Sequence, residues 1–448
     1  MTNDSDPGDP ALGRSPTRRS KAARYAFTAA SHLGALVSGM LTFKLAALAF
    51  GVEGFGAYAV ARRAISILAF PMMLGLSVSL PRCVASLPAG KGGGKGGVFL
   101  LAAWLIAVPG MAALTLGAAT RPGAMAVLMF GRGGHEELVW PTVAAVLGLC
   151  GHTIVYGFEM GRMRLGAAGT LWLVNLAAVP PAAVALSGGE VPRALLGLGI
   201  GWSVASAVAG LSLAAGLRIG TPRAWGAALR ELVRFGVPRM PGDLAMFGLF
   251  AVPTILVAHR SGLEPAGLVS FGLSLVQMIG SVFTAAGMLL LPIVSRLRAD
   301  GRIGEARRLV DRSLMASLAA GVLIVLAAEA SLATVITMLL DEGFTPAAGL
   351  ARRLLPAAVP FVAYIVLRGP IDALDVWPHN AVNLGLALAV TSAVMIFGSG
   401  PMEAATASLA GFSVLGLASI WSVRRCLAKA ERVSRAERKV AGALAASP

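Results

Sequence analysis

The chain has 448 residues, of which 56% are hydrophobic and only 13% are charged, and its mean hydropathy is +0.76. Soluble globular proteins carry about a quarter charged residues, so this composition excludes an ordinary water-soluble enzyme or binding domain. The formal net charge is +16. In so apolar a chain we attribute that charge to basic residues near anionic lipids rather than to nucleic-acid binding.

The apolar residues form stretches long enough to cross the hydrocarbon core of a bilayer as helices, which takes roughly 20 residues. The sequence lacks the short alternating segments of about ten residues that are typical of a membrane β-barrel. We therefore predict an all-α polytopic membrane protein with about twelve transmembrane helices. The predicted spans, in chain order, are 25–50, 58–80, 98–119, 138–158, 166–186, 194–217, 240–258, 268–291, 314–338, 354–372, 381–398 and 405–423.

Polar segments precede, divide and follow these spans. Residues 1–24 are rich in proline and basic residues, which predicts a disordered tail followed by an uncleaved first helix. We predict that residues 218–239 connect a lobe at 25–217 to a second lobe at 240–423. We predict that residues 424–448 form a second basic tail.

The lysines and arginines are distributed unevenly between the two predicted sides of the membrane. Of the 38 in the chain, 28 fall in the tails and loops of one side and 6 in the loops of the other. Short segments rich in Lys and Arg stay in the cytoplasm. The distribution therefore predicts that both termini are cytoplasmic.

Motifs for catalysis or for cofactor binding are missing from the sequence. Cys83, Cys150 and Cys426 are far apart, the five histidines are scattered, and no nucleotide-binding pattern occurs in a suitable context. We expect neither an enzyme nor a metal or other cofactor.

An internal repeat links the second predicted span to the eighth at an offset of 211 residues. The segment Gly51 to Gly56 matches Gly262 to Gly267, and Leu80-Pro81 matches Leu291-Pro292 at the same distance from each leading glycine. Turn glycines and helix-ending prolines are common, but the matched turn, helix length and stop favour a duplication. Because each half holds six spans, the two lobes would be related by an axis along the membrane normal and would enclose a central cavity.

At these residues the chain resembles the polysaccharide-unit flippases of the multidrug/oligosaccharidyl-lipid/polysaccharide exporter superfamily, over roughly residues 20–425. The similar segments, in chain order, are Gly51 to Tyr58, Tyr156 to Arg162, Leu232 to Pro238, Gly262 to Gly267, and Leu291 to Leu297 with the basic segment Gly301 to Arg312.

The resemblance implies a carrier in the bacterial inner membrane that moves undecaprenyl-pyrophosphate-linked oligosaccharides outward by alternating access for O-antigen or exopolysaccharide synthesis. Its implied partners are this lipid-linked substrate, membrane lipids and the polymerase or export proteins of that pathway. Two alternatives stay open. One is a multidrug-type cation antiporter of the same superfamily, and the other is a membrane glycosyltransferase or polysaccharide polymerase.

Three cations inside the first two spans are the candidate substrate-binding residues. Lys44 lies nine residues before Glu53, and Arg62 and Arg63 lie nine and ten after it, so an antiparallel hairpin brings all three to a similar depth. Such a level of positive charge suits a pyrophosphate. The alternative is that these side chains snorkel to the interface. Arg62 and Arg63 differ by about 100° around a helix, so we do not expect both to point the same way.

Four further residues are candidates for coupling or gating. The stretch Ala251 to Thr254 stands where similar proteins often carry an acidic residue in the seventh helix. Within it, Pro253 predicts a kink that would suit a gating element, and the alternative is an ordinary membrane-helix proline. Asp243, near the start of that helix, contacts the cavity or stabilises the helix terminus. Glu329 lies within the ninth span, where we favour a neutral, hydrogen-bonded carboxyl over a proton-coupling one. Arg368 is predicted to pair with Asp372, four residues further on.

Overall fold

The computed structural model describes residues 18–87, 92–214, 220–340, 342–375, 377–398 and 400–445. Within these ranges the chain is almost entirely helical, and eleven helical segments are long and apolar enough to cross a membrane. The predicted all-α polytopic fold is confirmed. Each of the last ten predicted spans corresponds to one segment, whereas the first two lie together in the segment Gly34–Met73.

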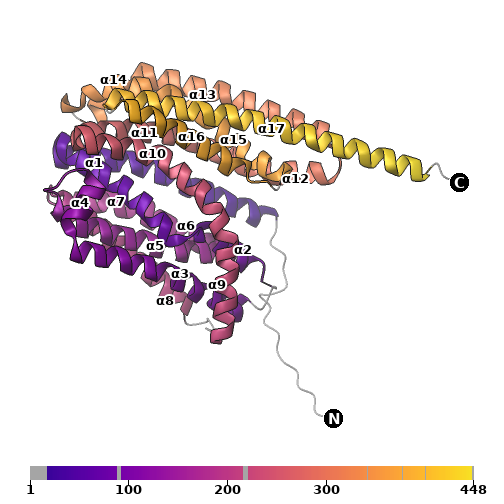
Figure 1. Ribbon diagram of the computed structural model, residues 1–448, viewed down its shortest axis with the longest axis horizontal. Helices are drawn as coiled ribbons and strands as arrows, with labels where there is room; N and C mark the ends of the chain where they lie inside the picture. Colours follow the sequence, from indigo (N-terminus) through magenta and orange to yellow (C-terminus); the bar gives the residue numbers. More distant parts are fainter. Residues whose placement is uncertain are drawn as a thin grey trace, which may run out of the picture.

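The first two predicted spans form one long helix, α1 (Arg18–Met73), which is broken at Gly51. Phe43 and Phe55 would be about 18 Å apart along a straight helix, yet their ring centroids lie 5.8 Å apart. Both ends of α1 accordingly lie toward the same end of the molecule (Figure 1). The predicted tail is wrong for residues 18–24, which are helical, while residues 1–17 lie outside the described part of the chain.

The predicted repeat is visible in the backbone at the two turns. Gly51 has φ 65° and ψ −169°, and Gly262, between α10 (Met240–Ser261) and α11 (Leu263–Val282), has φ 102° and ψ 178°. This region of conformational space is essentially restricted to glycine. Two glycines 211 residues apart thus make the same turn.

The second helix of each repeat is interrupted before its end. In the first repeat the break lies at Leu74 and Gly75, both with positive φ, and α2 (Leu76–Ala85) follows. In the second the break lies at Phe283, and α12 (Thr284–Ala299) follows. The prediction that Pro81 and Pro292 end these helices is wrong, because both lie inside helices. In a membrane protein neighbouring groups can satisfy the backbone that a proline frees.

The remaining helices complete two bundles. The first bundle contains α3 (Gly92–Thr120), α4 (Pro122–Phe130), η1 (Glu136–Leu138), α5 (Val139–Gly161), α6 (Leu165–Trp172), the π-helical turn η2 (Leu173–Ala178), α7 (Val179–Ala185) and α8 (Val191–Ala214). The predicted connector is itself helical: α9 (Pro222–Gly236) leads through η3 (Val237–Arg239) into α10. The second bundle continues with α13 (Ile303–Leu339), η4 (Glu342–Phe344), α14 (Pro346–Leu354), η5 (Leu355–Ala357), α15 (Ala358–Leu374), α16 (His379–Phe397) and α17 (Pro401–Ala445).

Helix α17 extends through most of the segment predicted to be a tail, and polar contacts fix its extension to the second bundle. Lys429 donates a hydrogen bond to Asp375, in the turn between α15 and α16, at 2.9 Å. This bond lowers the pKa of the Asp375 carboxyl to about 2. Arg307 of α13 contacts Glu431 at 3.5 Å. The first residues of the predicted basic tail, 424–445, are thus a helical continuation of α17.

The two bundles lie side by side and meet along α1, α10 and α11 (Figure 1). We call the end with the turns at Gly51 and Gly262 the hairpin end, and the end with α9 and the α15–α16 turn the connector end. Toward the connector end, α2 packs against α5 and α9 of its own side, whereas α12 packs against α15. The two segments at the connector end, α2 and α12, therefore diverge, while the parts of the repeated helices near the hairpin end stay together.

Candidate functional site

The two bundles approach most closely where equivalent positions of the repeat touch. Gly56 of α1 and Gly267 of α11 are 211 residues apart, and a Cβ on Gly267 would lie 2.5 Å from the Cα of Gly56. A Cβ on Gly56 would lie 2.2 Å from the carbonyl oxygen of Leu263. In a two-fold arrangement equivalent residues meet only near the axis. This contact therefore marks the pseudo-symmetry axis, and only glycine fits there.

Arg63 follows Gly56 on α1, and its guanidinium forms hydrogen bonds with the opposite bundle. Its Nη2 donates to Ser274 Oγ at 2.8 Å and to the Ser270 carbonyl at 3.2 Å, and its Nε donates to Ser270 Oγ at 3.2 Å. A longer contact of 3.4 Å joins Nη1 to Gln277 Oε1. Arg63 and Ser274 are again 211 residues apart. A guanidinium on one repeat is thus held by the hydroxyl at the equivalent position of the other.

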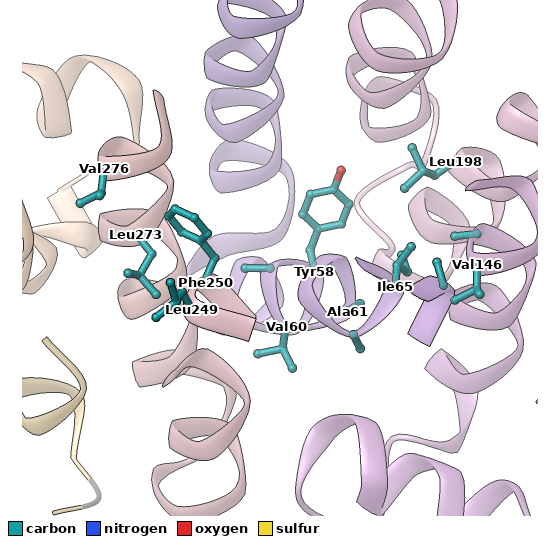
Figure 2. Packing of buried hydrophobic residues seen from close by; sticks show 14 of the residues in the cluster. Tyr58, Val60, Ala61, Ile65, Val146, Leu198, Leu249, Phe250, Leu273 and Val276 are labelled. Atoms are coloured by element: carbon teal, nitrogen blue, oxygen red, sulfur yellow. The ribbon is translucent and has the colours of Figure 1, made fainter. Parts of the chain in front are cut away.

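Buried apolar side chains surround this contact. Figure 2 shows Leu273 and Val276 of α11 and Phe250 of α10 on one side, and Val60 and Ala61 of α1 beside them. The Arg63 guanidinium carbon lies 5.9 Å from the centre of the Phe250 ring. We call the hydrogen bonds between Arg63 and the polar groups of α11 the Arg63 clamp. The clamp lies inside an apolar interface, where an unmade hydrogen bond is costly.

Arg62 and Lys44 are placed differently from Arg63. The half-buried Arg62 points back along α1, where its Nη1 donates to the Tyr58 hydroxyl at 3.3 Å. The half-buried Lys44 makes no hydrogen bond or ion pair within the described part of the chain. The two arginines thus contact different neighbours, as their helical spacing requires.

These three cations have no acidic partner among the described residues. The ion pairs of the described chain involve other side chains, outside α1. The hydrogen bonds of Arg62 and Arg63 within the described residues are with hydroxyl, carbonyl and amide groups. Positive charge inside a membrane-spanning segment therefore stays uncompensated, which is energetically expensive and typical of functional positions.

Asp243 and Arg368 belong to a second polar group near the connector end. Asp243 accepts a hydrogen bond from Ser77 of α2 at 3.3 Å, which joins the two bundles. The predicted ion pair between Arg368 and Asp372 is wrong for the described structure, because Asp372 accepts instead from Asn380 at 2.8 Å. Arg368 extends over the ring of Tyr364, at 6.0 Å from its centre. Both acids nevertheless lie within electrostatic range of Arg368.

Glu329 and Pro253 do not contact either group. The half-buried Glu329 makes no hydrogen bond within the described residues, so the predicted hydrogen-bonded carboxyl is not found there. Pro253 is buried inside α10, which stays helical from Met240 to Ser261. The proline is therefore accommodated without a break in the helix.

Solved structures with the same architecture are transporters and a flippase. A eukaryotic MATE transporter, AtDTX14, superposes with a TM-score of 0.64 at 12% identity, covering 92% of this chain and 99% of that one. An inward-facing multidrug resistance MATE family transporter of the MOP superfamily gives 0.61 at 13% identity, with coverages of 94% and 97%. The lipid II flippase MurJ, in an inward closed conformation, gives 0.60 at 13% identity, with 95% and 94%. The sequence matches no protein-family model and no curated protein.

The chain has the same fold as these solved proteins. At such identities the likeness concerns architecture alone. It extends over nearly the whole length of the proteins compared, so both bundles belong to the shared fold.

Within this fold, sequence reasoning missed a buried polar cluster in the first bundle. The Asn175 amide, in the π-helical turn, donates to His152 Nδ1 at 2.9 Å and to Ser206 Oγ at 3.3 Å. The Trp202 indole donates to the Asn175 carbonyl. The four residues come from three helical segments, so no short sequence motif identifies them. A lone asparagine in an apolar span was the available signal.

Sequence reasoning also missed the hydroxyls that hold Arg63. Ser270, Ser274 and Gln277 repeat at intervals of four and three residues on α11, which places them on one face of the helix. A polar stripe on an otherwise apolar span was visible in the sequence. Its partner was not, because the partner lies more than 200 residues away.

Proposed function

We propose that the protein is a flippase that moves undecaprenyl-pyrophosphate-linked oligosaccharides across the bacterial inner membrane by alternating access. The connector end then faces the cytoplasm, as the uneven distribution of Lys and Arg predicts. The substrate-binding residues are Lys44, Arg62 and Arg63, in a cavity between lobes at residues 25–217 and 240–423.

The observation that carries this proposal is the uncompensated positive charge on α1. A pyrophosphate brings at least two negative charges and several acceptor oxygens, and guanidinium groups bind such oxygens bidentately. Among the described residues Lys44 forms no hydrogen bond and Arg62 forms one, with Tyr58, so both side chains keep donors for a new partner. A cationic drug would meet repulsion at this level instead.

Arg63 has a conformational role in the proposed cycle. In the described conformation its hydrogen bonds to α11 hold the hairpin end closed. An arriving pyrophosphate competes for the same guanidinium, because charge-assisted hydrogen bonds to phosphate are stronger than those to neutral hydroxyls. Substrate binding therefore weakens the contact that keeps the two lobes together at this end, which couples binding to opening.

Transport of a defined probe in proteoliposomes tests the proposal. The probe is a fluorescent undecaprenyl-pyrophosphate disaccharide, whose outer-leaflet fraction is measured with a membrane-impermeant quencher. Wild-type protein should speed its exchange between leaflets. The variants Lys44→Gln and Arg62→Gln should each weaken its binding roughly ten- to a hundredfold, because each removes a charge-assisted contact of about 1.5–3 kcal/mol.

The matched control is Arg132→Gln, which removes an exposed arginine at the hairpin end. This variant should transport the probe at the wild-type rate. No exchange of the probe by well-folded wild-type protein would overturn the proposal. Proton-coupled transport of a cationic dye that is unaffected by Arg62→Gln would favour the multidrug-type alternative.

A further inference from the structure

Three side chains with metal-ligating atoms converge at the connector end, away from Lys44, Arg62 and Arg63 of α1. Asp375 directly follows α15, His379 begins α16, and Cys426 lies on the extension of α17. One carboxylate oxygen, one imidazole nitrogen and the thiol sulfur all lie within 4.8 Å of one another. Cys426 is buried, and the other two are half-buried. Residues from a turn and two helices therefore meet in one partly shielded position.

The geometry and donor set suit a tetrahedral divalent metal. Ligands bound to Zn²⁺ at about 2.0–2.3 Å stand roughly 3.4 Å apart across the tetrahedron. His379 Nε2 and Asp375 Oδ2 are 3.4 Å apart already. Cys426 is on a helix adjacent to both, so a change of rotamer can close the rest of the distance. A mixed set of sulfur, nitrogen and oxygen donors favours Zn²⁺ over Mg²⁺ or Ca²⁺, which prefer oxygen alone.

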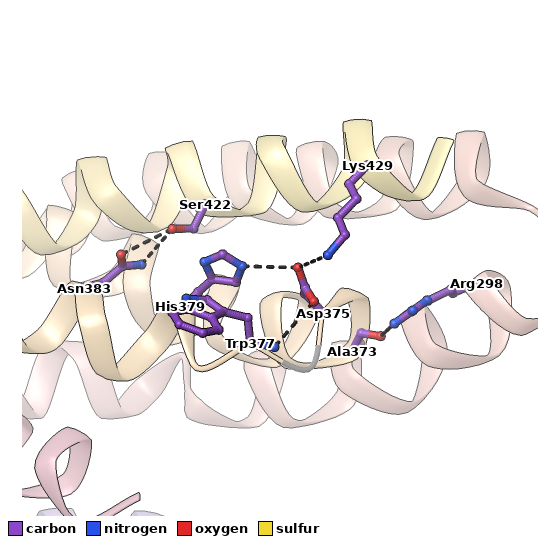
Figure 3. A network of polar contacts seen from close by, with 8 residues as sticks. All are labelled: Arg298, Ala373, Asp375, Trp377, His379, Asn383, Ser422 and Lys429. Carbon is purple, nitrogen blue, oxygen red and sulfur yellow. Dashed lines mark hydrogen bonds and ion pairs between the residues drawn. The ribbon is translucent and has the colours of Figure 1, made fainter. Parts of the chain in front are cut away.

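Lys429 occupies the cation position of this group in the described structure. Figure 3 shows its ammonium and the His379 ring both directed at the Asp375 carboxylate. The Lys429 side chain is 65% exposed, so it can turn into solvent at small cost when another cation arrives. A divalent ion carries twice its charge and binds three groups where the ammonium binds one.

We propose that Asp375, His379 and Cys426 form a binding site for Zn²⁺ or a similar thiophilic divalent metal, with Lys429 as the competing internal cation. The metal would tie the α15–α16 turn to the extension of α17. Water fills the fourth position of such a three-ligand site. Binding displaces the thiol proton of Cys426 to solvent, since the thiolate is the ligand.

Spectroscopic titration with Co²⁺ tests this proposal directly, because Co²⁺ substitutes for Zn²⁺ and a bound thiolate gives a distinct charge-transfer absorption. The titration uses full-length protein in detergent, without a histidine tag. Wild-type protein should bind one Co²⁺ with a thiolate band that excess Zn²⁺ removes. Cys426→Ser should abolish the band, and His379→Ala should weaken binding by about tenfold or more.

The chain offers two further variants that separate a built site from chance binding. Cys83→Ser removes a different buried cysteine and should leave the band unchanged. Lys429→Met removes the competing ammonium and should tighten Co²⁺ binding. The proposal is overturned if wild-type protein shows no thiolate band, if the band survives in Cys426→Ser, or if Lys429→Met binds Co²⁺ more weakly than wild-type protein.

Discussion

Removal of the Ser274 hydroxyl should open the hairpin end. Ser274→Ala deletes the shortest hydrogen bond between Arg63 and α11, at 2.8 Å, and leaves the longer contacts with Ser270 and Gln277. The substitution removes one oxygen from the interface and creates no bulk. Its effect should therefore fall on the equilibrium between closed and open hairpin ends rather than on folding.

The size of the effect follows from the chemistry of the bond. A hydrogen bond with a charged donor contributes about 1.5–3 kcal/mol. Its loss from the closed state alone shifts the ratio of closed to open molecules by roughly ten- to a hundredfold. Arg63→Gln removes the whole set of guanidinium contacts and should shift the ratio further in the same direction.

Distance measurement between spin labels can follow this shift. Leu186 and Phe397 are 85% and 91% exposed and lie in different bundles at the hairpin end. Labels are attached there after Cys83, Cys150 and Cys426 are replaced. Ser274→Ala should add a population at longer distance, whereas the control Ser281→Ala, on the same helix but bonded locally to Met278, should not. An unchanged distribution in both Ser274→Ala and Arg63→Gln would refute the clamp.

Three further outcomes are expected. Gly267→Ala should prevent full closure of the hairpin end and slow transport, since the added Cβ would meet the backbone of Gly56 at 2.5 Å; transport equal to wild type would contradict this. Asn175→Leu should destabilise the first bundle by about 1–3 kcal/mol, because His152 and Ser206 lose their partner; thermal unfolding in detergent measures it against the exposed variant Ser212→Ala. Reporter fusions at residue 448 and in the loop 187–193 should give opposite readings, with the former cytoplasmic.

The positions of the spans could be predicted from the sequence because hydropathy is a local property. Gly51 and Gly262 could also be matched, since the repeat preserves both residue type and spacing. The same reasoning failed at Pro81 and Pro292, where a proline was taken as a helix end. The true breaks lie at Leu74 and Gly75 and at Phe283. The first holds a glycine and the second does not, because the packing of the two bundles decides where each helix bends.

The candidate site was only half accessible to sequence reasoning. The expense of charge in a membrane singles out Arg62 and Arg63 in any reading of the sequence. What each arginine contacts depends on which helices meet at the pseudo-axis, and tertiary packing decides that. The same limit explains the metal ligands: Asp375 and His379 are close in sequence, but Cys426 joins them only through the packing of α17.

The length of α17 has a mechanical consequence. A helix of 45 residues is about 68 Å long, more than twice the roughly 30 Å of a hydrocarbon core. Its last part projects beyond the bundle as a stiff arm (Figure 1). If the second bundle tilts by about 10°, the tip of an arm of about 35 Å sweeps roughly 6 Å. A movement that is small at the pseudo-axis thus becomes large at the carboxyl terminus, where a label or a binding protein would register it.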